Sequence, residues 1–157
     1  MNADEIRKAV RPLVPGWSPY PKRFAIMGDE LTTVATMTYS AVDVQLYNGI
    51  WSTAAADAAN GDEFTFSVYL DVGTYTFYHM GRMHPECGKL DWYVDGTLVA
   101  SGREWYATTA TNKVDTFSVT ITNGGYHKVL MKVNGKNASS SDYRFICTKI
   151  WGKQATD

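Results

Sequence analysis

Phe64-Thr65-Phe66-Ser67-Val68-Tyr69-Leu70 is the stretch that decides the fold class of this chain. An apolar side chain stands at every second position, so on an extended strand these side chains share one face. Phenylalanine, valine and tyrosine also favour strands over helices. The stretch therefore predicts a β-strand that buries one face in a core.

Residues 74–78 form the next run of this kind, after the short turn Asp71-Val72-Gly73. The turn is too short for a parallel crossover, so we expect residues 64–70 and 74–78 to pair as an antiparallel hairpin. Two more hairpins are expected, around Asp95-Gly96 and around Asn123-Gly124-Gly125, because glycine accepts the positive φ of tight turns.

The spacing of these runs predicts about eight antiparallel strands in two sheets, an all-β jelly-roll β-sandwich. Long amphipathic helices have no room between the runs, and helix is expected at most over Ala54–Ala59 and in the first ten residues. The expected strands are 41–46, 64–70, 74–78, 89–94, 97–99, 116–122, 126–133 and 143–151.

Length and charge limit the classes of function. The chain has 157 residues and a formal net charge of -1, which suits one domain and argues against a nucleic-acid partner. No apolar run approaches the roughly 20 residues that cross a bilayer, so membrane insertion is not expected. Met1–Val10 lacks the apolar centre of a signal peptide, so none is expected in this sequence.

The first 23 residues differ from the rest in composition. Four of the five prolines lie there, and the stretch holds five basic and two acidic side chains, a net charge of +3. We interpret residues 1–23 as an extended docking arm and residues 24–157 as the sandwich domain. The candidate assembly residues of the arm are Arg7, Arg11, Trp17, Tyr20 and Arg23.

Catalytic motifs are not found. Asp91 and Asp95 stand about 13 Å apart on one strand, too far to flank one glycosidic bond, and are interpreted as solvated surface acids. The chain has neither a Gly-x-Ser-x-Gly elbow nor a phosphate or dinucleotide loop. We therefore expect neither an enzyme nor a cofactor.

Four metal-ligand residue types, His79, His84, Glu86 and Cys87, fall within nine positions. Zinc sites normally show paired spacing such as Cys-x-x-Cys, and this cluster does not. We interpret the cluster as a polar loop between strands and expect no metal. His127, which starts a predicted strand, is interpreted as a packing residue.

Aromatic residues are abundant, with 5 Trp, 10 Tyr and 6 Phe. Some lie in connecting segments, and Tyr69, Tyr78 and Tyr93 lie on strand faces opposite the apolar positions. A flat ring beside polar groups suits the apolar face and hydroxyl edge of a sugar, and it suits a protein interface equally well. The candidate glycan-binding residues are Trp51, Trp105, Tyr106, Tyr47 and Arg103.

Three segments, 71–77, 89–96 and 124–130, together resemble the jelly-roll carbohydrate-binding modules. That family has a "G-x-Y" strand, a hairpin ending in "D-G" and a "G-x-H-x-hydrophobic" strand, and the likeness spans about residues 48–151. The resemblance implies a sugar site in the loops at one edge of the sandwich, and Trp51, Trp105 and Tyr106 match its aromatic positions best.

Residues 133–141 are similar to segments of virion structural proteins of tailed bacteriophages. Together with the arm, this resemblance implies a non-catalytic structural and adhesive protein of a virion or similar extracellular assembly, such as a capsid decoration or a tail fibre. Its partners would be copies of itself or another virion or filament protein. The alternative is a carbohydrate-binding module that recognises a polysaccharide through exposed aromatic rings.

Overall fold

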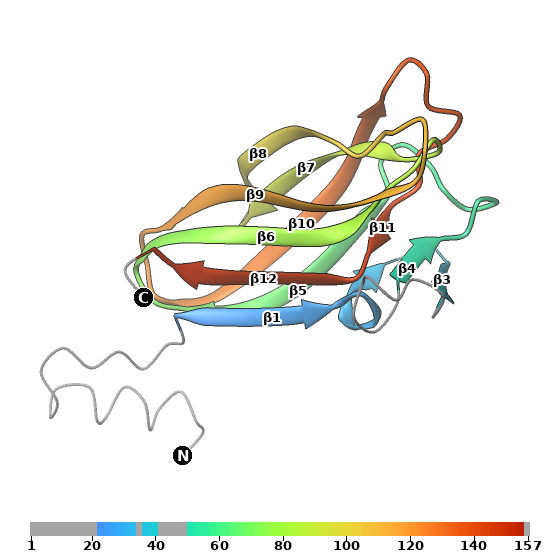
Figure 1. Ribbon diagram of the computed structural model, residues 1–157. Helices are drawn as coiled ribbons and strands as arrows, with labels where there is room; N and C mark the ends of the chain where they lie inside the picture. The colour runs from blue at the N-terminus through green and yellow to red at the C-terminus, as the bar shows by residue number, and fades with distance from the viewer. Residues whose placement is uncertain (1–21, 34–35, 41–49, 156–157) are drawn as a thin grey trace, which may run out of the picture.

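A computed structural model describes residues 22–33, 36–40 and 50–155 and shows two large β-sheets packed face to face (Figure 1). The four-stranded sheet has the order β1-β12-β6-β9, the five-stranded sheet β2-β5-β10-β7-β8, and a three-stranded sheet β11-β4-β3 lies at one end. All pairs between these strands are antiparallel. The predicted all-β jelly-roll β-sandwich is confirmed.

The described residues contain twelve strands and one short 3-10 helix, more elements than the eight strands predicted. Several of the additional strands have only two to five residues. In chain order the elements are β1 (Arg23–Met27), η2 (Gly28–Glu30), β2 (Thr32–Thr33), β3 (Met37–Ser40), β4 (Ile50–Thr53), β5 (Glu63–Leu70), β6 (Gly73–Met83), β7 (Gly88–Val94), β8 (Thr97–Glu104), β9 (Thr111–Ile121), β10 (Gly125–Lys136), β11 (Ile146–Cys147) and β12 (Lys149–Gln154). Among the described residues, no helix is long and apolar enough to span a membrane.

The core lies between the two large sheets. On β5, the side chains of Phe64, Phe66, Val68 and Leu70 are all buried, as the alternation predicts. Burying one such side chain contributes about 1.5–3 kcal/mol to folding, so this face holds β5 against the opposite sheet. Trp92 of β7 is also fully buried in this core.

The predicted pairing of residues 64–70 with 74–78 is wrong. β5 pairs with β2 and β10, whereas β6 pairs with β9 and β12, so the turn at Asp71–Gly73 carries the chain from one sheet to the other. Gly73 makes this crossing at a φ of 150°. Both strands still bury their apolar faces, because the two faces point at each other across the core.

The predicted hairpin around Asn123-Gly124-Gly125 is wrong for the same reason, since β9 and β10 belong to different sheets. The hairpin around Asp95-Gly96 is confirmed, with β7 paired to β8. Asp95 and Gly96 both adopt a positive φ, 49° and 81°, as a two-residue hairpin turn of this type requires.

Four further predictions concern single segments of the chain. The helix predicted over Ala54–Ala59 is wrong, because the structure has turns there. The predicted last strand, 143–151, is divided into β11 and β12. The strand predicted at 41–46 lies outside the described residues. Arg23, predicted as the last residue of the arm, is the first residue of β1 and lies opposite Lys153 of β12.

Both cysteines are buried and free. Burial raises the pKa of the Cys87 thiol to about 12, although the nearby Arg144 acts in the opposite direction. Burial also raises the pKa of the Cys147 thiol. Both thiols are therefore protonated at neutral pH.

His79 is part of the core, not of the polar loop predicted for it. Its ring lies on β6, fully buried, with ring centroids 4.2 Å from Trp105 and 5.8 Å from Trp92. Burial lowers its pKa to about 3, even though the nearby Asp115 carboxylate raises it. The imidazole is therefore neutral in the folded protein above that pH.

We expect His79 to make the fold sensitive to mild acid. Its folded pKa lies below the ordinary value of 6.5, so the unfolded chain takes up a proton as the pH falls from about 6.5 to 3. The free energy of unfolding should fall by up to about 1.4 kcal/mol per pH unit more in the wild type than in His79→Leu. Urea unfolding at several pH values measures this, with Val119→Ala, a core substitution that removes no titratable group, as the control. Parallel curves for the wild type and His79→Leu would contradict the prediction.

Candidate functional site

A pocket of about 270 Å³ lies at the end of the sandwich that carries β3, β4 and β11 (Figure 1). We call it the Arg144 pocket. Segments that are far apart in the sequence meet there, because β3 and β4 form the small sheet while β6 ends and β9 begins beside them. Its lining residues are Thr38, Ile50, Ser52, Arg82, His84, Ala110, Arg144 and Ile146.

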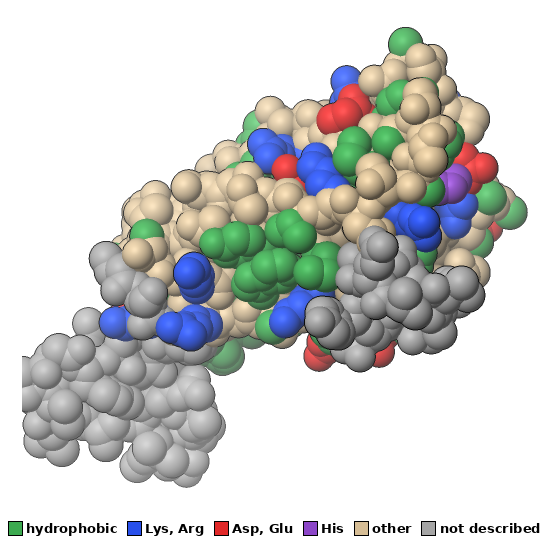
Figure 2. All heavy atoms as spheres, viewed as in Figure 1, with side chains coloured by type: hydrophobic (Ala, Val, Ile, Leu, Met, Phe, Trp, Pro, Cys, Tyr) green, Lys and Arg blue, Asp and Glu red, His purple; other side chains and the backbone are tan. Residues whose placement is uncertain are grey.

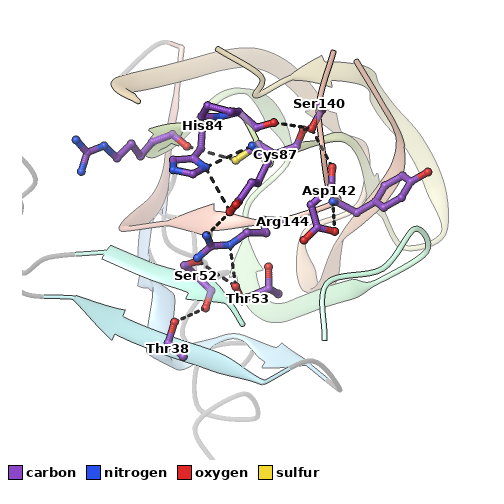
Figure 3. Close-up of polar contacts among 12 residues, drawn as sticks. Thr38, Ser52, Thr53, His84, Cys87, Ser140, Asp142 and Arg144 are labelled. Carbon is purple, nitrogen blue, oxygen red and sulfur yellow. Dashed lines mark hydrogen bonds and ion pairs between the residues drawn. The ribbon is translucent and has the colours of Figure 1, made fainter. Parts of the chain in front are cut away.

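The Arg144 guanidinium joins two of these segments (Figure 3). Its Nη1 donates to Glu86 Oε2 at 2.6 Å, its Nε donates to the Thr53 carbonyl at 3.1 Å, and its Nη2 donates to Ser52 Oγ. The hydrogen bond from Arg144 is the main reason that the pKa of Glu86 lies below its usual range. A guanidinium with three acceptors has a fixed orientation, so this wall of the pocket is pre-organised.

Backbone contacts hold the same wall in place. The Arg144 amide donates to the Glu86 carbonyl at 2.8 Å, and the Gly88 amide donates to the Arg144 carbonyl at 3.1 Å. Ser140 Oγ lies within 3.1 Å of the carbonyl oxygens of Pro85, Cys87 and Asp142 (Figure 3). These contacts fasten the turn before β7 to the loop after β10.

The imidazole of His84 has fewer hydrogen-bond partners within the protein than the Arg144 guanidinium has. Its Nδ1 accepts a hydrogen bond from the Glu86 amide at 3.3 Å, so the proton of the neutral ring is on Nε2. Burial is the largest influence on its pKa and lowers it below 6.5; Arg144 and Arg82 act in the same direction, and Glu86 opposes them. At neutral pH the ring is therefore an uncharged donor at the pocket.

The pocket combines hydrogen-bonding groups with an apolar surface. The hydroxyl-bearing residues Thr38 and Ser52 share its lining with Ile50, Ala110 and Ile146. A small ligand with hydroxyl groups on a carbon skeleton matches both kinds of surface. Among the described residues, no group of three or more His, Cys, Asp or Glu could hold a metal ion.

Trp105 is not the exposed ring that the sequence analysis expected. Its side chain is 3% exposed and packs in the core against His79, and Lys113 Nζ lies 4.9 Å from its ring centroid. It cannot present a ring face to a ligand. Trp105 directly follows the end of β8. Its burial could not be predicted from the sequence, because residues 105–110 lack the alternation of a strand.

Trp51 and Tyr106 lie at the same end as the Arg144 pocket, and both are half-buried. Trp51 packs on the backbone of Gly28, where an added methyl group would stand 2.7 Å from its Cδ1. Tyr106 follows Trp105, whose carbonyl accepts a hydrogen bond from the His84 amide at 3.1 Å. The structure therefore brings both segments to the pocket, although neither residue lines it. Tyr47 lies outside the described residues, as do Arg7, Arg11, Trp17 and Tyr20 of the arm.

Arg103 has a structural role that the sequence did not reveal. Its Nε and Nη2 donate to the two carboxylate oxygens of Asp115 at 2.7 and 2.6 Å, and Nη2 also reaches the Thr116 carbonyl. Arg103 is on β8 and Asp115 is on β9, so this pair joins the edges of the two sheets. Its guanidinium is therefore already bound within the protein.

Asp91 is not a solvated surface acid. It is 5% exposed and accepts hydrogen bonds from the Gly102 amide at 2.7 Å and from Asn134 Nδ2 at 2.6 Å. Asp95 has an exposed side chain, as predicted, but one of its oxygens contacts His127 Nδ1 at 2.7 Å. Both acids thus serve internal contacts.

Aromatic residues also decorate the outer faces of the sheets. The rings of Tyr78 on β6 and Trp151 on β12 are parallel, with centroids 4.9 Å apart, and Figure 2 shows a hydrophobic patch over these two strands, flanked by lysine and arginine side chains. On the five-stranded sheet, Tyr93 and Leu130 line a shallow hollow of about 420 Å³. The prediction that Tyr69, Tyr78 and Tyr93 face away from the core is confirmed.

Comparisons with known proteins bear on the fold. No family model and no curated protein matches this chain. Xanthan lyase of Paenibacillus is similar over 87% of this chain, with a TM-score of 0.68 and 24% identity, although the chain spans only 13% of the lyase.

Two carbohydrate-binding modules match over almost their whole length. The CBM36-1 domain of a xylanase from the hindgut metagenome of Trinervitermes trinervoides has a TM-score of 0.60 and 12% identity, covering 85% of this chain and 98% of the module. CBM6cm-2 of Cellvibrio mixtus lichenase 5A, solved with cellotriose, has a TM-score of 0.60 and 10% identity, covering 84% and 97%. At these identities the likeness shows the jelly-roll fold.

Trp105→Ala is expected to weaken the fold. Removing a buried indole leaves a cavity, so the free energy of unfolding should fall by about 3–5 kcal/mol. Tyr106→Ala, at a half-buried neighbour, should change it by no more than about 1 kcal/mol. Urea unfolding followed by tryptophan fluorescence measures both variants, and equal losses would contradict the burial of Trp105.

Proposed function

We propose that this chain is a carbohydrate-binding module that holds a polysaccharide without cleaving it, and that the Arg144 pocket contributes to the binding site. The observation that carries the proposal is this pocket, which places hydroxyl, imidazole and guanidinium groups around an apolar surface. The module-length similarity to carbohydrate-binding modules of xylanase and lichenase supports the same function.

The chemistry of a sugar unit fits the pocket. A pyranose ring has C–H groups that suit Ile50 and Ile146 and hydroxyl groups that suit His84 Nε2, as a donor, and Thr38 Oγ1, as an acceptor. Arg144 is fixed before a ligand arrives, so little conformational entropy is lost on binding. The half-buried rings of Trp51 and Tyr106 lie in segments beside the pocket and add aromatic surface for further sugar units.

The acids near the pocket support binding without cleavage. Glu86 is engaged by Arg144, and that hydrogen bond stabilises its ionised form, which is the opposite of what a general acid needs. Asp91, which lies in the five-stranded sheet and does not line the pocket, accepts hydrogen bonds from Gly102 and Asn134. A binding role does not require these carboxylates to transfer a proton or to attack a substrate.

His84→Ala tests the proposal. The side chain is 30% exposed and its own bonds are few, so the variant should keep its stability while losing a donor to the ligand. We expect the affinity for a bound polysaccharide to fall about five- to tenfold. Affinity electrophoresis in gels containing xylan, β-glucan, mannan or xanthan, followed by calorimetry, measures this effect.

Ser118→Ala, on an exposed position of β9, is the matched control and should bind like the wild type. Wild-type migration unaffected by every polysaccharide in the panel would reject the proposed function. Equal affinity of His84→Ala and the wild type would remove the Arg144 pocket from the site.

The structural and adhesive role on a virion stays a prediction. It depends on residues 1–23, of which 1–21 lie outside the described residues, and the similar structures support sugar binding instead. The feature that bears on self-association is the hydrophobic patch over β6 and β12 (Figure 2). Such patches are typical of protein contact surfaces.

Deleting residues 1–21 tests whether the arm joins copies of the chain. The deletion leaves β1 intact, so the sandwich should stay folded. If the arm mediates self-association, light scattering will give the mass of two or more chains for the full-length protein and the mass of one chain for the shortened protein. Monomers in both preparations would contradict the assembly role and would leave sugar binding unaffected.

A further inference from the structure

A second cleft lies at the opposite end of the sandwich, where the β7–β8 turn meets the end of β9 and the start of β10 (Figure 1). Its volume is about 390 Å³, and we call it the His127 cleft. β9 runs from beside the Arg144 pocket to this cleft, and its 11 residues separate the two by about 30 Å. The lining residues are Val94, Asp95, Thr97, Val99, Thr120, Ile121, Thr122, Asn123 and His127.

One side of the His127 ring is fixed by Asp95. Nδ1 lies 2.7 Å from Asp95 Oδ2, and the other carboxylate oxygen accepts the Lys128 amide at 2.9 Å. Burial raises the pKa of Asp95, but these hydrogen bonds outweigh it and the pKa lies below its usual range. An ionised carboxylate only accepts, so Nδ1 carries the proton and the neutral ring presents an acceptor at Nε2.

The other side of the ring is unsatisfied. His127 is 7% exposed, and its Nε2 is buried without a hydrogen-bond partner among the described residues. Leaving a buried polar atom unpaired is unfavourable. A ligand that donates a hydrogen bond to Nε2 would remove the unpaired atom.

The rest of the lining defines the ligand. Thr97, Thr120, Thr122 and Asn123 can donate and accept hydrogen bonds without carrying charge, and the three aliphatic residues provide an apolar surface. The Asp95 carboxylate disfavours an anion. A neutral molecule with several hydroxyl groups on a compact carbon skeleton fits this set of groups.

We infer that the His127 cleft is a second saccharide site, which takes one neutral pyranose unit whose hydroxyl donates to His127 Nε2. The inference goes beyond the proposed function, because it uses different residues at the other end of the sandwich. The Asp95–His127 pair acts as a positioning device that keeps the acceptor nitrogen directed away from the carboxylate.

NMR titration of the full chain tests this inference. The probes are glucose, galactose, mannose and xylose, each up to about 100 mM, a range that detects millimolar dissociation constants. We expect at least one sugar to shift the amide signals of Thr97, Thr122 and Asn123 saturably, together with the ring Nε2 signal of His127. If none of the four sugars shifts these signals, the inference is overturned.

A pair of matched variants identifies the contacts. Thr97→Val with Thr122→Val keeps the shape of the lining and removes two hydroxyls, so the affinity should fall about tenfold. Thr116→Val, on an exposed position of β9, should bind like the wild type. Equal affinity of the double variant and this control overturns the inference. Shifts confined to the signals of Ser52 and His84 overturn it too, while leaving the proposed function in place.

Discussion

The stacking of Phe145 on Phe64 connects the core of this protein to its candidate site. The two rings lie 4.1 Å apart at 14°, and the Phe145 amide donates to Thr53 Oγ1 at 2.8 Å. The segment that follows β10 is thereby held between the core and β4. Arg144, the preceding residue, can reach Ser52 and Glu86 only because Phe145 is buried in this way. The geometry of the pocket is thus a consequence of hydrophobic packing.

The sequence predicted the fold class because a two-residue period has one physical meaning, a strand with one buried face. It failed on the partners of these strands. Phe66 and Phe77 show the same alternation whether their strands are neighbours in one sheet or face each other across a core, and the turn at Asp71–Gly73 allows both. Only at Asp95-Gly96 does the turn chemistry specify a hairpin, and that prediction holds.

The candidate site was less predictable. Arg144 binds Glu86, 58 residues away, and Ser52, 92 residues away, and no local pattern marks such partners. Aromatic rings draw attention in a sequence, yet burial depends on the tertiary fold, so Trp105 looked like a ligand platform and is a core residue. The resemblance to sugar-binding modules placed its expected aromatic residues in loops, and Trp51 and Tyr106 lie at the end of the sandwich that holds the Arg144 pocket. Of the polar residues that line the pocket there, only His84 stood out in the sequence, as part of an expected polar loop.

The two buried cysteines have a consequence for how the protein responds to redox conditions. Cys87 and Cys147 are both free and shielded from solvent, and the raised pKa values keep their sulfur atoms as thiols. A thiol without thiolate character is a poor nucleophile and reacts slowly with oxidants or disulfides. The fold therefore depends on neither a reducing nor an oxidising milieu, and its surface should behave alike in both.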